Sequence, residues 1–83
     1  MNKILITILV PSIDEQYDLF VPINMKITEA IDLIQSAIYE LSGEYYHKNP
    51  SALLIDNIDG KIINPNNIVK YSGLRNGSRI MLV

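Results

Sequence analysis

The chain has 83 residues, a formal net charge of −2 at pH 7 and no cysteine. A chain of this length forms one small domain, so we expect a single unit over residues 1–83. The composition excludes disulfides, thiolate metal sites and a cysteine nucleophile. Because the chain has no run of Lys or Arg and no stretch of ~20 apolar residues, we expect neither a nucleic-acid partner nor membrane insertion.

The N-terminal segment is predicted to form a β-hairpin. Residues 3–10 are mostly β-branched, which favours a strand, and Thr7 marks one of its two alternate rows as outward. A polar loop follows, and residues 17–21 return as a second strand with Asp18 and Phe20 on its outward row. The wholly apolar row of the first strand is predicted to face the core: Ile4, Ile6, Ile8 and Val10.

Residues 27–41 are predicted to form a helix, because apolar residues recur at spacings of three and four. No clean N-cap precedes the helix, and Gly43 is a natural terminator. The exposed side is acidic, which we interpret as a solvated face; the alternative is a docking surface for a basic partner. The acidic residues of this region are Glu29, Asp32, Glu40 and Glu44.

The rest of the chain is predicted to contain three short strands. They cover residues 52–55, 61–63 and 79–83. Tight turns at Asp59-Gly60 and Asn76-Gly77, and an irregular or 3₁₀ segment over residues 68–74, connect them. One helix with one apolar face needs a sheet to cover it. The predicted fold class is α+β: a β-grasp with a mixed sheet of four to five strands packed on one helix, the first and last strands pairing at its centre. The predicted core is Ile4, Ile6, Ile8, Leu19, Val21, Ile27, Ile31, Ile34, Ile38, Leu53, Ile55, Ile80 and Leu82.

The residues with catalytic or metal-binding potential are interpreted as ordinary surface groups. His47 stands alone in a polar loop, and Asp56 and Asp59 lack the alternating ligands and distal Glu of a calcium loop. We therefore predict no catalytic residue, no cofactor and no metal site, and expect that the protein is not an enzyme. Tyr45 and Tyr46 are interpreted as closing over the end of the core with wet hydroxyls; the alternative is an aromatic anchor for a partner.

The outward row of the predicted sheet carries more apolar side chains than scatter would place there. With no second layer to cover it, a contiguous apolar patch indicates an interface. Asp18 and Arg79 border this patch. Its occupant would be a protein partner or a second copy of the chain. The candidate partner-binding residues are Leu5, Leu9, Phe20, Leu54, Met81 and Val83.

Several short motifs resemble known ubiquitin-like proteins. The ending from Ser78 to Val83, with Lys70-Tyr71-Ser72-Gly73-Leu74 before it, resembles the corresponding end of ubiquitin. More closely, three segments resemble the YukD/EsaB family of bacterial ubiquitin-like proteins. They are Tyr17-Asp18-Leu19-Phe20-Val21-Pro22, then Ile27 with Ala30-Ile31-Asp32, then Tyr71 with Leu74-Arg75-Asn76-Gly77. An Asp often follows the glycine of this last turn in that family, and Ser78 stands here in its place.

The resemblance implies a small cytoplasmic component of the type VII secretion system of Gram-positive bacteria. Such a component would act as an accessory or regulatory subunit that binds protein non-covalently. Members of that family lack the Gly-Gly tail of conjugated ubiquitin, and this chain ends Met81-Leu82-Val83, so we expect no covalent tagging. The alternatives are a ubiquitin-like modifier or sulfur carrier, which that ending disfavours, and a β-grasp interaction module unrelated to secretion.

Overall fold

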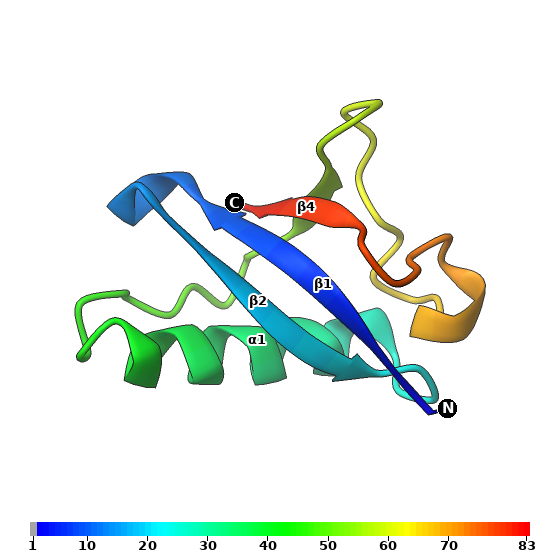
Figure 1. Ribbon diagram of the computed structural model, residues 1–83, viewed down its shortest axis with the longest axis horizontal. Coiled ribbons are helices and arrows are strands. Elements are labelled where there is room, and N and C mark those ends of the chain that lie inside the picture. Colours follow the sequence, from blue (N-terminus) through cyan, green and yellow to red (C-terminus); the bar gives the residue numbers. More distant parts are fainter. Residues whose placement is uncertain (1) are drawn as a thin grey trace.

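A computed structural model describes residues 2–83 of the chain. Four strands form one mixed sheet in the order β2-β1-β4-β3, and helix α1 covers one of its faces (Figure 1). The strands β1 and β4 run parallel at the centre, and the other pairs are antiparallel. This is the predicted β-grasp arrangement. The elements are β1 (Lys3–Val10), β2 (Glu15–Pro22), α1 (Ile27–Leu41), β3 (Leu54–Asp56) and β4 (Arg79–Leu82).

The hairpin of β1 and β2 follows the alternation of the sequence. A 3₁₀ turn over Pro11–Ile13 and a left-handed Asp14 reverse the chain, so Ile8 pairs with Tyr17. Because opposite residues of an antiparallel pair share a face, the apolar rows of both strands turn toward α1. The second strand is longer than predicted and extends over Glu15–Pro22, where Pro22 closes the ladder against Lys3.

Helix α1 has the predicted bounds, and its C-terminal end is fixed by local bonds. Gly43 takes the left-handed conformation with φ 66°, which glycine adopts without a Cβ clash. Its N–H donates to the Glu40 carbonyl at 3.0 Å, and the Glu44 N–H donates to the Tyr39 carbonyl at 2.7 Å. These two bonds are the Schellman pattern, which satisfies carbonyls that the helix leaves free.

The N-terminal end of α1 is capped from a distant part of the chain. The N–H groups of Ile27 and Thr28 donate to the carbonyls of Asn67 and Pro65 at 2.8 and 3.1 Å. The Lys26 N–H donates to the Glu29 carboxylate at 3.1 Å, which adds a local bond. The missing N-cap side chain is therefore replaced by a loop that is remote in sequence, and this contact also attaches the C-terminal half to the helix.

The turn before β4 sets the central parallel pair. The Asn76 side-chain oxygen accepts the Leu5 N–H at 2.8 Å, and the Gly77 N–H donates to the Leu5 carbonyl at 2.8 Å. Gly77 has φ 86°, a conformation that other residues rarely adopt. The Thr7 N–H then donates to the Ser78 carbonyl at 2.9 Å. Asn76 thus begins the pairing that brings β4 alongside β1.

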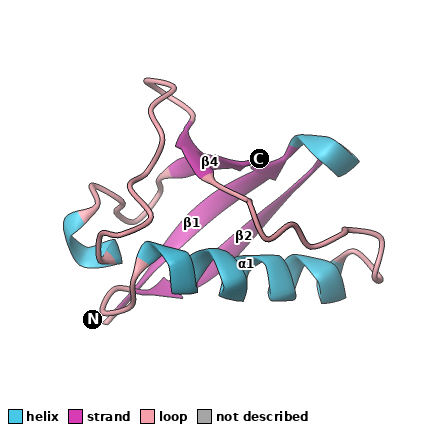
Figure 2. Ribbon diagram, turned by 180° about the vertical axis from the view of Figure 1, so that it is seen from behind, coloured by secondary structure: helices cyan, strands magenta, loops and turns pink. Residues whose placement is uncertain are grey.

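The predicted strands of the C-terminal half differ from those of the structure. The third strand covers Leu54–Asp56 rather than residues 52–55, and residues 61–63 contribute an isolated bridge between Ile62 and Ile55 rather than a strand. A 3₁₀ helix at Val69–Tyr71 confirms the irregular segment predicted there. Figure 2 shows long loops between the short strands and the 3₁₀ helix of this half.

The core between sheet and helix agrees with the prediction at most positions. Ile6, Ile8, Ile34, Ile38 and Ile80 are at most 1% exposed, and the predicted Ile4 and Leu19 are only partly buried. The chain after α1 supplies further buried side chains that the predicted core omitted. These are Tyr46, Ala52, Leu54, Ile63, Val69 and Leu74.

Candidate functional site

The face of the sheet that α1 does not cover carries a continuous apolar row. Leu9 of β1 is opposite Met81 of β4, Met81 is opposite Ile55 of β3, and Ile55 is bridged to Ile62. Paired residues project to the same side, so these four side chains are neighbours on one surface. Ile62 is 57% exposed, and the other three are half-buried. We call Leu9, Met81, Ile55 and Ile62 the outer apolar row.

A polar row runs beside the outer apolar row. Thr7 is opposite both Asp18 and Arg79, and its hydroxyl donates to an Asp18 carboxylate oxygen at 2.7 Å. Beyond this polar row, Leu5 pairs with Phe20, which is 57% exposed. The outer face therefore consists of two apolar areas separated by charged and hydroxyl groups. A partner on this face must match both kinds of surface, which gives orientation as well as contact area.

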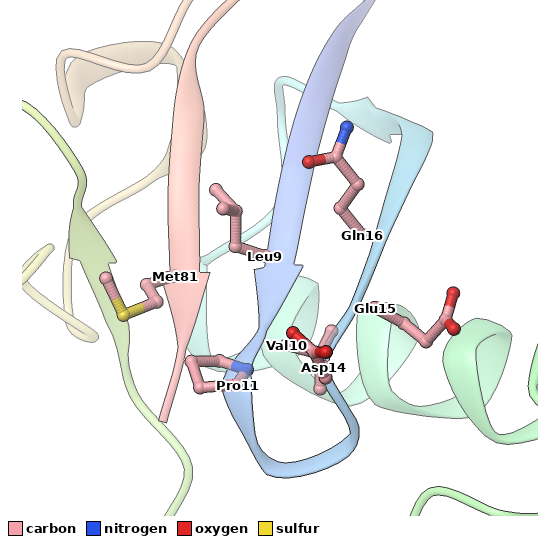
Figure 3. A pocket seen from close by; sticks show the side chains of 7 residues that line it. All are labelled: Leu9, Val10, Pro11, Asp14, Glu15, Gln16 and Met81. Carbon is pink, nitrogen blue, oxygen red and sulfur yellow. The ribbon is translucent and has the colours of Figure 1, made fainter.

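The outer apolar row ends in a shallow depression near the β1–β2 turn. Its volume is ≈ 300 Å³, and its apolar lining comes from Leu9, Val10, Pro11 and Met81. Figure 3 shows the side chain of Leu9 on β1 between Met81 on β4 and Gln16 on β2. Asp14 of the turn and Glu15 and Gln16 of β2 complete the lining, and the Glu15 carboxylate points away from Leu9 and Met81 in Figure 3. The arrangement suits an apolar side chain of a partner, since the lining offers few polar groups that converge on one point.

Five of the six predicted partner-binding residues have the predicted orientation, and Leu54 does not. Leu54 is opposite Leu82, which is 3% exposed, and is itself 0% exposed. The outward residues of this segment are instead Ile55 and Leu53, because Ile55 pairs with Met81 and Leu53 exchanges two backbone bonds with Val83. Every residue from Ala52 to Ile55 is apolar, so alternation gives no signal for which row faces inward.

Two residues of the outer apolar row were missed by sequence reasoning for different reasons. The prediction assigned Ile55 to the core because it exchanged the inward and outward rows of β3. Ile62 was assigned to a short strand without an orientation, and only the bridge to Ile55 shows that it extends the row while its neighbour Ile63 is buried. The alternation from Lys61 to Asn64 is too short to set a period.

The predicted aromatic pair is divided between core and surface. Tyr46 is 5% exposed, and its hydroxyl is not wet, because it donates to Gln35 at 2.7 Å. Gln35 also accepts the Asn49 N–H at 2.7 Å and donates to the Asn49 carbonyl at 3.0 Å. Burial raises the pKa of the Tyr46 phenol. Tyr45 is 69% exposed, so only Tyr46 closes the core.

The other polar candidates are a solvent-exposed histidine and two aspartates that bond to turn backbone. His47 is exposed, and the Asp56 and Asp59 carboxylates accept the backbone N–H groups of Ile58 and Lys61. Over residues 2–83, no group of three or more His, Cys, Asp and Glu residues is placed to hold a metal ion. Within the same range, no helix is both long and apolar enough to cross a membrane.

Comparison with solved structures establishes the ubiquitin-like β-grasp fold. The ubiquitin-like domain of the Mycobacterium tuberculosis type VII secretion system protein EccD1 superposes with a TM-score of 0.75 at 16% identity, over 100% of this chain and 99% of that chain. The ubiquitin-like domain of an Arabidopsis thaliana protein gives a TM-score of 0.73 at 16% identity, over 100% of this chain and 78% of that chain.

A structural neighbour from an enzyme complex has the same fold. A chain of the toluene 4-monooxygenase HD complex gives a TM-score of 0.76 at 10% identity, over 98% of this chain and 96% of that chain. No protein-family model and no curated protein matches the sequence. At these identities the likeness establishes the fold and not the activity, because β-grasp domains serve unrelated systems.

Proposed function

We propose that this protein binds another protein non-covalently through the outer face of its sheet and catalyses no reaction. The observation that carries the proposal is the outer apolar row, which α1 does not cover. The row spans three strands and a bridge, and a contiguous exposed apolar patch is typical of an interaction site. Its burial would supply about 25 cal/mol for each Å² of apolar surface, before the costs of association.

The proposed setting is the cytosolic side of a type VII secretion system in Gram-positive bacteria, with the protein as an accessory or regulatory subunit of the YukD/EsaB kind. Two independent likenesses support it. The sequence resembles that family at residues 17–22, 27–32 and 71–77. The EccD1 domain, described as part of a type VII secretion system protein, matches this chain over nearly the full length of both.

A β-grasp interaction module outside secretion is the second candidate. The structural neighbour in the toluene 4-monooxygenase HD complex favours it, because that chain has the same fold in an unrelated assembly. The two candidates share the binding surface and differ in the partner. Two observations distinguish the candidates: the protein that contacts the outer face in the cell, and the change in secretion when the outer face can no longer bind.

The test is a pair of outer-face variants in the native host, Met81→Asp and Ile62→Asp. A matched control is Tyr71→Asp, because Tyr71 is 68% exposed and lies in the 3₁₀ helix rather than on the outer face. Each protein is first checked for folding by circular dichroism. We expect both outer-face variants to lower export of type VII substrates, while the control leaves it unchanged. Normal export with folded outer-face variants would contradict the secretion role.

Site-specific photocrosslinking distinguishes the two candidates. A photoreactive residue at position 62 should capture a component of the secretion machinery, and one at position 71 should not. Capture at position 62 of a protein unconnected with secretion, together with unchanged export, would favour the second candidate. The absence of any adduct specific to position 62 would exclude the outer face as the interface in both.

A further inference from the structure

The edge strand β2 has backbone groups that the sheet leaves unpaired. In residues 2–83, β2 pairs with β1 alone. The backbone of Leu5 and Thr7 bonds toward the β4 side, and adjacent residues of a strand point their N–H and C=O groups in opposite directions. The bonds of β1 to β2 therefore come from Ile4, Ile6 and Ile8. It follows that the N–H and C=O groups of the alternate β2 residues face the open edge: these are Gln16, Asp18 and Phe20.

A groove adjoins this edge at the end of the helix. It has a volume of ≈ 330 Å³ and lies between the start of β2 and the C-terminal end of α1. Its apolar lining includes Leu41, which is 60% exposed, and Tyr45, which is 69% exposed. Ile13 and Tyr17 line the opposite side, and Glu15 and Ser42 complete the lining. Leu41 and Tyr45 are thus exposed beside the unpaired edge of β2. An additional strand at this edge would bury them.

The charge of this side of the molecule indicates what kind of strand it accepts. Residues 10–25 and 27–47 contain no Lys or Arg. The carboxylates of these two segments are Asp14, Glu15, Asp18, Glu29, Asp32, Glu40 and Glu44. Residues 60–83, by contrast, contain four basic residues and no Asp or Glu. A cation does lie near the β2 edge, since the Lys3 Nζ is 5.1 Å from the centroid of the Phe20 ring. An extended segment with basic side chains would be attracted to the β2 side.

A second copy of the chain fits this edge poorly. Antiparallel pairing of β2 with another β2 about Asp18 would bring two Asp18 carboxylates opposite each other, and like charges directly opposite are destabilising. Glu15 adds further negative charge to the same strand. The edge therefore disfavours pairing with β2 of a second copy and still accepts a basic strand. Charged edge strands avoid self-association in this way.

We propose that the edge of β2 and the groove formed by Ile13, Tyr17, Leu41 and Tyr45 are a second protein-binding site, which takes an extended segment of alternating apolar and basic residues as an added strand. The apolar row of that segment would lie over the groove. Its basic row would lie on the outer side, next to Asp18. This site is separate from the outer apolar row and does not depend on it.

The test compares two substitutions at Gln16, whose N–H faces the open edge. Gln16→Pro removes that donor and places a ring in the path of an added strand, without removing a bond to β1. Gln16→Thr also removes the amide side chain but keeps the N–H, so it is the matched control. The probe is a synthetic octapeptide of alternating lysine and valine, titrated into ¹⁵N-labelled protein, with an octapeptide of glutamate and valine as the charge control.

We expect the lysine peptide to shift the amide signals of Gln16, Asp18 and Phe20 and to bind Gln16→Pro about tenfold more weakly than Gln16→Thr, as the loss of a backbone hydrogen bond implies. Leu41→Ser, a second variant on the helix side of the groove, should also weaken binding. Met81→Asp should not, which separates this site from the outer face. Equal binding of both peptides, equal affinity of the two Gln16 variants, no binding, or shifts confined to the outer apolar row would overturn the proposal.

Discussion

The two faces of the sheet differ although neighbouring residues of the same strands supply both. Ile8 is 0% exposed beneath α1, and Leu9, the next residue, lies in the outer apolar row. Leu54 is 0% exposed, and Ile55 after it is half-exposed on the other side. Apolar character alone therefore does not identify the core of this protein. The covered face stabilises the fold, and the uncovered face is available for binding.

Substituting Leu54 and Ile55 separately gives the strongest test of this difference. Leu54→Ala should lower the free energy of unfolding by about 2–5 kcal/mol, because it leaves a cavity in the core. Ile55→Ala should cost clearly less, because water already reaches that side chain. Chemical denaturation of both variants measures the two values. Equal losses, or a larger loss for Ile55→Ala, would show that the register of β3 is wrong.

The buried polar network on the helix side should contribute the next largest effect. Gln35→Ala leaves the Tyr46 hydroxyl and the Asn49 N–H without their shared partner. We expect a loss of about 1–3 kcal/mol in unfolding free energy, the usual cost of unsatisfied buried polar groups. The neighbouring exposed Ser36→Ala is the control and should change it by less than about 0.5 kcal/mol. Urea titration measures both, and an effect of Gln35→Ala no larger than the control would exclude a structural role for the network.

High pH should weaken the same network. Burial raises the pKa of Tyr46 in the folded protein, so above about pH 10 the unfolded chain loses the phenol proton first. The folded state then binds more protons than the unfolded state. The contribution of the Tyr46 phenol to stability is fully present below its pKa in the unfolded chain and is lost as the pH rises through its pKa in the folded protein. Tyr46→Phe should remove this part of the decline, as measured by urea unfolding across that range; an identical decline in the variant would refute the assignment.

The smallest stability effect is expected on the outer face. Ile62→Thr keeps a β-branched residue at a position that is 57% exposed, so the free energy of unfolding should change by less than about 0.5 kcal/mol. Thermal unfolding of variant and parent provides the measurement. If the outer face binds protein as proposed, the same variant should weaken that binding. A large loss of stability would instead mean that Ile62 belongs to the core.

The sequence predicted the elements whose pattern is long and regular. The alternation in residues 3–10 and the apolar stripe of residues 27–41 set the first strand and the helix, and the Asn76-Gly77 turn indicated the last strand. The outward orientation of Leu5, Leu9, Phe20, Met81 and Val83 followed from these patterns. Their role in binding stays a prediction.

The tertiary structure decided what the short or uniformly apolar segments do. Ala52 to Ile55 has no alternation, so pairing of Leu54 with the buried Leu82 fixed which side faces the core. The N-cap residue of α1 has no capping side chain, and the carbonyls of Pro65 and Asn67 supplement the single local bond from the Lys26 N–H to Glu29. The sequence pattern places Gln35 on the polar side of the helix, but in the structure its side chain bonds to Tyr46 and Asn49. Local sequence determines an element when its hydrophobic period extends over several helical turns or strand pairs. In shorter segments the neighbouring segment of the fold determines the structure, because buried polar groups need a hydrogen-bond partner from it.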